Sequence, residues 1–312
     1  RLGHSVLEFS DRDIVKHYKG FNDYTGGKTL NQKLINTVYN YKPDLLIFGH
    51  ADLIKNNTLS YLRDNYKNLR TAQWFLDPLM KDGPDFDKNK SRILDKIEFT
   101  DSNFITTSPD VLNFLPKRKT CLFMPNPTDP SFEVLNNYEN SRCSMDVFFA
   151  LSHGVHRGIL KKGKHDERAD YVNRLVEITP NVKFDLYGIN NVQPIWADSF
   201  LKSISNSKMG VNLSRGNPIK YYSSDRLVQL IGNGLLTFID KKTNYDHFFT
   251  CKEMIFYNNL SDLSEKIQKY KKNNRERKVI ARNGKIKYFK YFNSKIVSQY
   301  IINKTFEFKV NK

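Results

Sequence analysis

Residues 220–240 concentrate chemistry that can hold a phosphate, in the run KYYSSDRLVQLIGNGLLTFID. A polar stretch with two cations, Lys220 and Arg226, precedes an apolar helical pattern, two glycines and a strand-like LLTFI. Ser223 or Ser224 is a candidate N-cap, and the glycines are candidate C-caps. A helix N-terminus beside two cations suits a phosphate, although the same pattern also fits an ordinary capped helix between two strands.

More candidate phosphate ligands follow the strand-like run MDVFFAL, in the loop SHGVHRGILKKGKHDER. Its cations can neutralise a diphosphate leaving group, and its glycines let the backbone approach one. In open α/β sheets ligands bind beyond the carboxyl ends of strands, which favours this loop, whereas a solvated basic loop is the alternative. The predicted donor-binding residues are His153, Gly154, Arg157, Lys161, Ser214, Arg215, Lys220, Tyr222, Ser224, Asp225, Arg226 and Gln229.

Two strand ends in the first half of the chain carry titratable side chains. DLLIFGH ends in His50 and TAQWFLD ends in Asp77. Either group can serve as a general base on an acceptor hydroxyl, and both strand ends are expected to face an interdomain cleft. A cap or turn role is the alternative for each residue.

Two further motifs have both a functional and an ordinary interpretation. Asp85-Phe86-Asp87 is a DxD triplet, whose carboxylates at that spacing can hold Mg²⁺ or Mn²⁺, but it lies in a Pro/Gly turn without a preceding strand. We therefore predict a loop there and no metal site. KIKYFKYF, from Lys285, interleaves cations with aromatics, which suits a membrane surface, nucleic acid or core contacts at helical spacing.

Strand-like and helical runs alternate along most of the chain, which indicates parallel sheets with helices on both faces. In the first half the expected strands are HSVLEFS (from His4), DLLIFGH, TAQWFLD, FITTS and TCLFMP. A proline-containing stretch at 125–142 reads as a linker, after which MDVFFAL, KFDLYG, MGVNLS, LLTFI and EMIFY continue the series. The prediction is two domains, 1–136 and 137–312, with a nearly all-helical end from residue 260.

The run RLVQLIGNGLL resembles the donor-site helix of GT-B glycosyltransferases, particularly the spore-maturation (CgeB-like) branch, whose pattern is roughly R-x-F-E-x-x-x-x-G. Arg226 and Gly234 match that pattern, and Gln229 stands where the family usually has a Glu that accepts hydrogen bonds from ribose. Gln accepts through its carbonyl but loses the charge-assisted bond. QWFLDP, FMPNPTDPSF and RERKVIARNGKIKYFKYF also resemble segments of this family.

The resemblance implies two doubly wound Rossmann-like domains of the GT-B type, with an interdomain cleft and a C-terminal helix that crosses back to the first domain. In the first, acceptor-side domain, RLGHSVLEFS resembles the segment that in this family follows a first strand, a glycine-rich loop and a helix. Those elements do not precede it here, so either this sequence starts late or the first domain is trimmed. The resemblance further implies a metal-independent, hexosyltransferase-like enzyme without a cofactor. Its substrates are a nucleoside diphosphate sugar and a glycan or lipid-linked acceptor, in cell-surface polysaccharide or glycoconjugate synthesis.

The composition of the chain limits its possible partners and cellular location. Fifty Lys and Arg against 33 Asp and Glu give a net charge of +17, which favours anionic partners. No apolar run approaches a membrane span, and three cysteines at no metal spacing favour a reducing, cytoplasmic compartment. Peripheral contact with the inner face of an anionic membrane is also compatible with the sequence. Two alternative functions are compatible with it as well. One is nucleic-acid binding, although no nucleic-acid-binding signature occurs, and the other is catalytically silent binding of a sugar or nucleotide on the same fold, suggested by Gln229.

Overall fold

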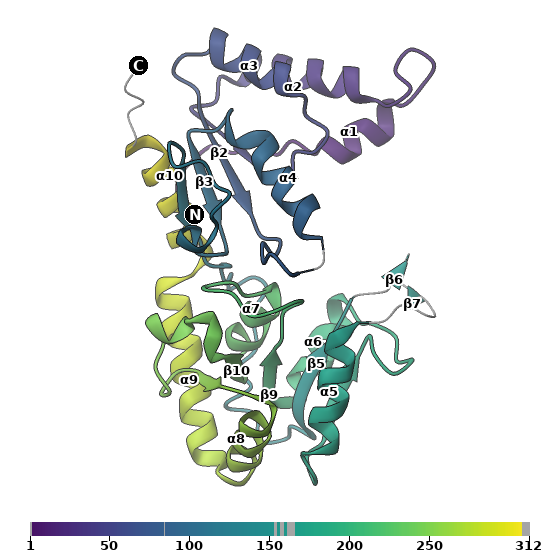
Figure 1. Cartoon of the computed structure of the whole chain (residues 1–312), viewed down its shortest axis with the longest axis vertical. Helices are drawn as coiled ribbons and strands as arrows, with labels where there is room; N and C mark the ends of the chain where they lie inside the picture. The colour runs from purple at the N-terminus through teal and green to yellow at the C-terminus, as the bar shows by residue number, and fades with distance from the viewer. Residues whose placement is uncertain (1, 84, 153–154, 157–158, 161–165, 308–312) are drawn as a thin grey trace. The chain divides into compact units, whose positions relative to one another are not determined.

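The computed structural model describes residues 2–83, 85–152, 155–156, 159–160 and 166–307. The chain forms two compact units (Figure 1). Unit 1 contains Arg1–Leu79, Asp85–Met124 and Lys295–Lys312, and unit 2 contains Met80–Pro84 and Pro125–Ser294. The main division therefore falls after Met124, where the sequence placed it after residue 136.

Unit 1 is built on a fully parallel sheet in the order β1-β2-β3-β4. Its strands are β1 Leu45–Phe48, β2 Arg70–Phe75, β3 Ser102–Ile105 and β4 Thr120–Phe123. Its helices are α1 Asp11–Tyr18, α2 Gly27–Tyr41, α3 Asn56–Asn65, α4 Phe86–Ile97, the 3-10 turn η1 Pro109–Val111 and α10 Ser294–Glu307. Four of the five strands expected in the first half are thus confirmed.

The fifth expected strand, HSVLEFS from His4, is wrong. Residues 4–10 form no strand, and Val6 and Leu7 are exposed. An alternating apolar pattern makes a strand only where a neighbour completes the hydrogen-bond ladder and a core covers one face. Here the sheet has β1 at its edge, and the segment leads instead into α1.

The last helix, α10, belongs to unit 1, as the resemblance implied. Its Val297 joins a cluster with Ala72 and Phe104 of the sheet, and the Tyr300 ring meets Phe104 edge-on with centroids 5.7 Å apart. The hydroxyls of Thr305 and Ser102, both buried, lie 2.7 Å apart. The chain therefore completes the first core with its final helix.

Unit 2 contains a second parallel sheet, in the order β11-β10-β9-β5-β8. Its strands are β5 Met145–Ala150, β8 Phe184–Tyr187, β9 Ser207–Asn212, β10 Leu236–Asp240 and β11 Ile255–Tyr257, with a small hairpin of β6 Val155–His156 and β7 Ile159–Leu160. Its helices are α5 Glu167–Glu177, α6 Ala197–Ser205, α7 Asp225–Gly232, α8 Leu260–Lys272 and α9 Asn274–Tyr291, with 3-10 turns η2 Lys241–Thr243 and η3 Tyr245–His247. All five strands expected here are confirmed.

The neighbours β5 and β9 form the switch point of this sheet. The chain leaves β5 toward β8 on one side and returns to β9 on the other. Val147 and Phe149 of β5 pack in the cluster that contains α5, whereas the intervening Phe148 packs with Leu230 of α7. Helices α5 and α7 therefore cover opposite faces, and ligands of such sheets bind beyond the strand ends at this point.

The segment expected to be a linker packs against the end of α7. Gly234 has φ +77°, and its N–H and that of Leu235 donate to Ile231 and Leu230 in a Schellman motif, which confirms the glycine C-cap. A Cβ on Gly234 would lie 2.7 Å from the Tyr138 ring. Two features therefore require glycine at position 234: its positive φ, and the close approach of the Tyr138 ring to its Cα.

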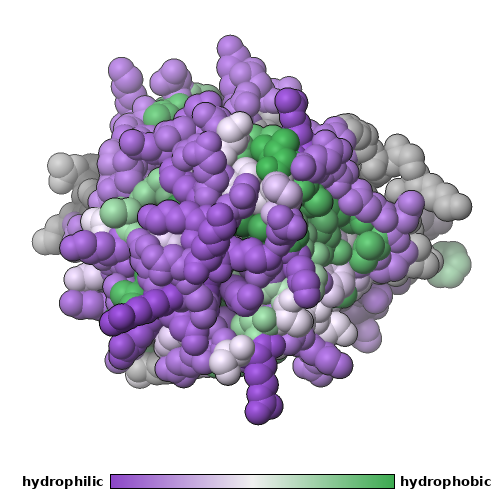
Figure 2. All heavy atoms as spheres, turned by 90° about the horizontal axis from the view of Figure 1, so that it is seen from below, coloured by the Kyte–Doolittle hydropathy of each residue, from purple (hydrophilic) through white to green (hydrophobic). Residues whose placement is uncertain are grey.

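The surface seen from below in Figure 2 is mostly hydrophilic, with apolar groups in a few separate patches. This agrees with a chain in which 27% of residues are charged. Among the described helices, none combines the length and hydrophobicity needed to cross a membrane.

Candidate functional site

The sheet of unit 1 brings the two predicted general bases together. β1 and β2 are parallel neighbours, so the residues that follow them, His50 and Asp77, leave the sheet at the same edge. His50 Nε2 lies 3.2 Å from Asp77 Oδ2, and each side chain is 34% exposed. A carboxylate that accepts the Nε2 proton leaves the lone pair of a neutral imidazole on Nδ1. The two residues form a His–Asp pair rather than two independent candidates.

Asp77 is held as a carboxylate. The hydrogen bond from His50 lowers its pKa, and the positive charge of Arg92 adds to the effect. Arg92 Nη1 lies 3.5 Å from Asp77 Oδ2, while its Nη2 binds Asp52 at 2.7 Å. A carboxylate with a lowered pKa is a weak base but a good orienting group for a histidine.

In unit 2, Arg226 spans the switch point. Its Nε and Nη2 donate to the carbonyl of Ala150, at the end of β5, at 3.1 and 2.9 Å. Its Nη1 donates to the carbonyl of Leu213, just after β9, at 2.7 Å, and to Ser224 Oγ at 3.3 Å. The guanidinium also lies 4.8 Å from the Phe149 ring centroid. Of the five N–H donors of an arginine, protein atoms take four.

Burial lowers the pKa of Arg226 to about 10, because the charged form loses solvation, and the nearby Arg168 adds to the shift. The side chain remains partly exposed by surface area. It stays cationic at neutral pH, and its charge stabilises two strand-end carbonyls. Its described contacts are with protein atoms, and the predicted pairing of Arg226 with a diphosphate stays a prediction.

The N-terminus of α7 is also less open than the sequence suggested. Ser224 occupies the N-cap position, but no hydrogen bond from the helix backbone reaches its side chain. Its hydroxyl donates to Asn212 Oδ1 at 3.2 Å instead. Asp225 is the exposed first residue of the helix, and Ser223 is buried against the Tyr245 hydroxyl at 2.8 Å.

A cavity of about 250 Å³ opens at the carboxyl edge of the unit 2 sheet. Its walls come from the first turns of α5, the loop after β9 and the ends of β10 and β11. The lining residues are Glu167, Arg168, Tyr171, Asn212, Leu213, Ser214, Gly216, Asn217, Pro218, Tyr222, Asp240, Thr243 and Tyr257.

The cavity offers hydrogen-bond acceptors and aromatic surface more than free positive charge. Arg168 is engaged bidentately by Asp166, with bonds of 2.9 and 2.7 Å. Glu167 Oε1 accepts from the Gly216 N–H at 2.7 Å. Burial raises the pKa of the Asp240 carboxyl above its ordinary value. The buried hydroxyl of Ser214 has no hydrogen-bond partner among the described residues, so a ligand can satisfy it.

The structure therefore collects only part of the predicted donor site. Ser214 and Tyr222 line the cavity, while Lys220 lies with Nζ 5.1 Å from the Tyr221 ring and Arg215 is partly buried on the same loop. Gln229, on α7, is not among the described residues that line the cavity. His153, Gly154, Arg157 and Lys161 lie outside the described residues.

Sequence reasoning missed the acidic and aromatic walls of the cavity. Asp240 follows the run LLTFI, so the rule that selected Asp77 at a strand end also selects it. Tyr171 comes from the first half of α5, where only the apolar pattern had been considered, and Glu167, at the end of the predicted basic loop, is the first residue of that helix. Arg92 in unit 1 carried no signal, because it lies in the middle of α4, far along the chain from His50.

The DxD triplet begins a helix. Asp85 is the N-cap of α4, with φ +63°, and Asp87 lies in the first turn, where a carboxylate interacts favourably with the helix dipole. The Phe86 ring packs edge-on against Phe114, with centroids 5.8 Å apart. Within the described part of the chain, no group of three or more His, Cys, Asp or Glu residues is placed to hold a metal ion.

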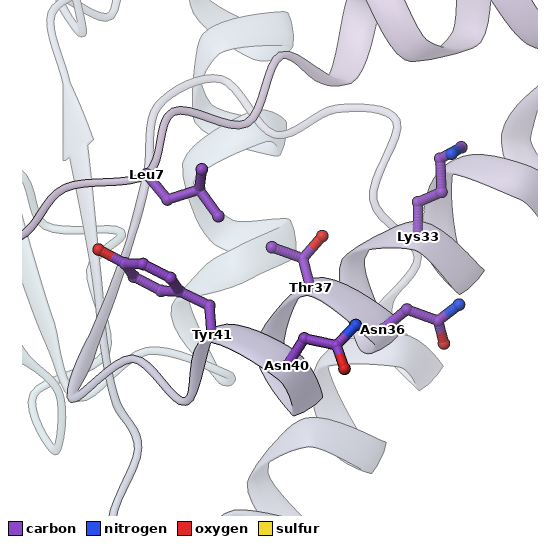
Figure 3. Close-up of a pocket in the computed structure, with 6 residues that line it drawn as sticks. All are labelled: Leu7, Lys33, Asn36, Thr37, Asn40 and Tyr41. Atoms are coloured by element: carbon purple, nitrogen blue, oxygen red, sulfur yellow. The ribbon is translucent and has the colours of Figure 1, made fainter.

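A separate shallow hollow of about 420 Å³ lies on α2 in unit 1 (Figure 3). Figure 3 shows Lys33, Asn36, Asn40 and Tyr41 along one face of the helix, with Leu7 of the N-terminal segment across from them. Since α2 leads into the start of β1, this hollow lies away from the carboxyl edge that carries His50.

The arrangement of two parallel, helix-covered sheets, with a last helix returning to the first, defines the GT-B fold. Solved structures with this fold confirm it. HepE from Anabaena, crystallised with UDP, superposes with a TM-score of 0.61 at 11% identity, covering 90% of this chain and 82% of HepE. Sucrose-phosphate synthase from Thermosynechococcus elongatus gives 0.61 at 10% identity, covering 90% and 78%. A glycosyltransferase from Rickettsia africae gives 0.57 at 11%, covering 90% and 81%.

Within this fold, residues 168–303 match the family model described as glycosyl transferase-like. The match begins in α5 and covers all the residues that line the cavity except Glu167, together with α7, α8, α9 and most of α10. No curated protein sequence matches the chain significantly. The solved structures show that the chain has the GT-B fold, as the sequence resemblance predicted, and neither they nor the family model single out the CgeB-like branch.

Proposed function

We propose that this protein transfers a sugar from a nucleoside diphosphate sugar to a hydroxyl of a glycan or lipid-linked acceptor, in polysaccharide or glycoconjugate synthesis. The observation that carries the proposal is the cavity beside the switch point of unit 2. All of its lining residues except Glu167 lie in the segment that matches the glycosyl transferase-like model. HepE, which shares the fold, was crystallised with UDP and with UDP-glucose.

The cavity suits the nucleoside half of such a donor. Carboxylates such as Glu167 and Asp240 accept hydrogen bonds from ribose hydroxyls, and the rings of Tyr171 and Tyr222 offer surface to a base. Arg168 and Arg226 donate to protein atoms, and the predicted diphosphate contacts remain those named from the sequence: Lys220, Arg215 and the loop after β5. The acidic walls argue against nucleic acid as the ligand here.

The acid–base step belongs to unit 1 in this proposal. His50, oriented through Nε2 by Asp77, takes the proton of the acceptor hydroxyl on Nδ1. Asp77 itself stays ionised and stabilises the imidazolium. No metal or cofactor takes part in this proposal.

The test is to incubate the full chain with a panel of nucleoside diphosphate sugars and to follow release of the nucleoside diphosphate, with and without EDTA. We expect one or a few donors to turn over and EDTA to have no effect. If nucleotides bind saturably but no donor releases its nucleoside diphosphate, even with glycan acceptors present, the protein is a catalytically silent binder. Loss of turnover in EDTA that Mg²⁺ or Mn²⁺ restores would contradict metal independence.

A further inference from the structure

The loop between α1 and α2, residues 19–26 (KGFNDYTG), exposes two aromatic rings. Phe21 is 103% exposed and Tyr24 is 87% exposed, more than any other aromatic side chain among the described residues. In Figure 1 this loop extends past the ends of both helices that it connects. Soluble surfaces carry single apolar residues, but two fully exposed rings on one projecting loop are a binding feature.

The loop is held in one conformation by its own backbone. Gly20 and Asp23 exchange two N–H···O bonds of 3.2 Å, which places Phe21 at the tip of a tight turn. The Asp23 carboxylate accepts the Thr29 N–H at 2.7 Å, so it also caps the start of α2. Gly26 has φ +70°, and a Cβ there would lie 2.5 Å from the Val15 carbonyl. Binding through this loop therefore requires little new ordering.

The charge around the loop is positive. Residues 10–33 contain five Lys or Arg and three Asp. Lys19 and Lys28 are exposed on either side of the two rings, whereas the Asp23 carboxylate is turned toward the helix N-terminus. Lys33 Nζ lies 4.4 Å from the Tyr18 ring on the neighbouring helix. Cations at the base and aromatics at the tip match an anionic lipid surface.

We infer that the 19–26 loop docks the protein on an anionic lipid bilayer. Phe21 and Tyr24 enter the interfacial region, where aromatic rings are favoured, and Lys19 and Lys28 meet the headgroups. The run KIKYFKYF, the segment that its sequence suggested for such a role, cannot supply the rings in the same way, because Tyr288 is fully buried. The inference involves no residue of the proposed donor or acid–base sites and stands apart from the proposed function.

The experiment is co-sedimentation of the full chain with vesicles of phosphatidylcholine alone and of phosphatidylcholine mixed with phosphatidylglycerol. We expect binding to the mixed vesicles. Phe21→Ser/Tyr24→Ser should lower the partition coefficient by at least about tenfold, because two rings leave the interface. The matched control Phe132→Ser/Tyr39→Ser makes the same two changes at sites that are 72% and 64% exposed, and it should bind like the wild type.

Charge is tested separately with Lys19→Gln/Lys28→Gln. Each lysine near an anionic surface contributes about 1 kcal/mol, so binding to the mixed vesicles should fall roughly fivefold for each lysine replaced. All these sites are exposed, and unfolding midpoints should match the wild type. Failure to bind mixed vesicles, or equal losses in the loop and control variants, would overturn the inference. So would self-association without vesicles that the loop variant abolishes, since the loop would then be a protein contact.

Discussion

At the carboxyl edge of the unit 1 sheet, His50 and Asp77 pair with each other and remain one third exposed, so one imidazole nitrogen stays available. At the corresponding edge of unit 2, Arg226 is used almost entirely by the carbonyls that end β5 and β9. Both sites lie at the carboxyl ends of parallel strands, where ligands of such sheets bind. The comparison shows that the rule locates an edge of the sheet, whereas the contacts of each side chain, which the rule does not give, differ between the two sites.

The largest effect is expected for His50→Ala. If His50 is the base, turnover should fall by about 10²- to 10⁴-fold with the dissociation constant of the donor unchanged, because only proton transfer is lost. Steady-state transfer rates together with donor titration of the folded variant measure both quantities. Wild-type turnover in this variant would leave the His–Asp pair as a structural contact and remove the contrast between the two edges.

Arg226→Ala is expected to act on stability. It removes charge-assisted bonds to two strand-end carbonyls, so the free energy of unfolding should fall by about 2 to 4 kcal/mol. Denaturant unfolding measures the change, and Arg226→Lys should recover only part of it, since an ammonium cannot reproduce the planar fork.

Ligand titration of Arg226→Ala sharpens the same point. Nucleoside and nucleoside diphosphate should be weakened alike, because the guanidinium supports the edge rather than the phosphates. A selective loss of diphosphate affinity, with the free energy of unfolding unchanged, would instead restore the phosphate-binding role predicted from the sequence.

Ser214→Ala tests the cavity with a smaller effect. Its buried hydroxyl has no partner among the described residues, so the apo protein should keep its stability. If a ligand hydroxyl satisfies it, donor affinity should fall by about 2- to 10-fold. Calorimetry with a nucleoside diphosphate sugar measures the loss, and Ser131→Ala, on an exposed loop, is the matched control. Equal affinity in both variants would place the donor elsewhere.

The smallest effect concerns Asp77 and pH. Its pKa is lowered in the folded state, so the carboxylate stabilises the fold above its ordinary pKa of 3.8, and this contribution disappears as pH falls through the lowered value. The stability difference between the wild type and Asp77→Asn should therefore be larger at pH 7 than in strong acid. Unfolding curves at both pH values measure it. If the stability difference between the two proteins is the same at both pH values, ionisation of Asp77 contributes nothing to the stability of the fold.

Much of the fold could be predicted because its signals are local. Short apolar runs separated by helical patterns predicted nine strands that the structure contains. Gly234 predicted the end of α7, because a C′ residue in the left-handed conformation is usually glycine. The exception, the segment from His4, has the right pattern but no neighbour to pair with. Pairing is a property of the sheet and not of the segment.

The sequence by itself determined that the chain alternates strands and helices in two sheets, and that titratable and cationic residues follow the strands. Only the tertiary structure decided which groups those residues contact and how far they are buried. Arg226 donates hydrogen bonds to the carbonyls of Ala150 and Leu213, and the cavity walls come from four separate elements. Likewise Tyr288 is buried while Phe21 is exposed, although each has a lysine within two residues in the sequence. Burial and hydrogen-bond partners depend on residues distant in the chain, and local spacing carries no information about them.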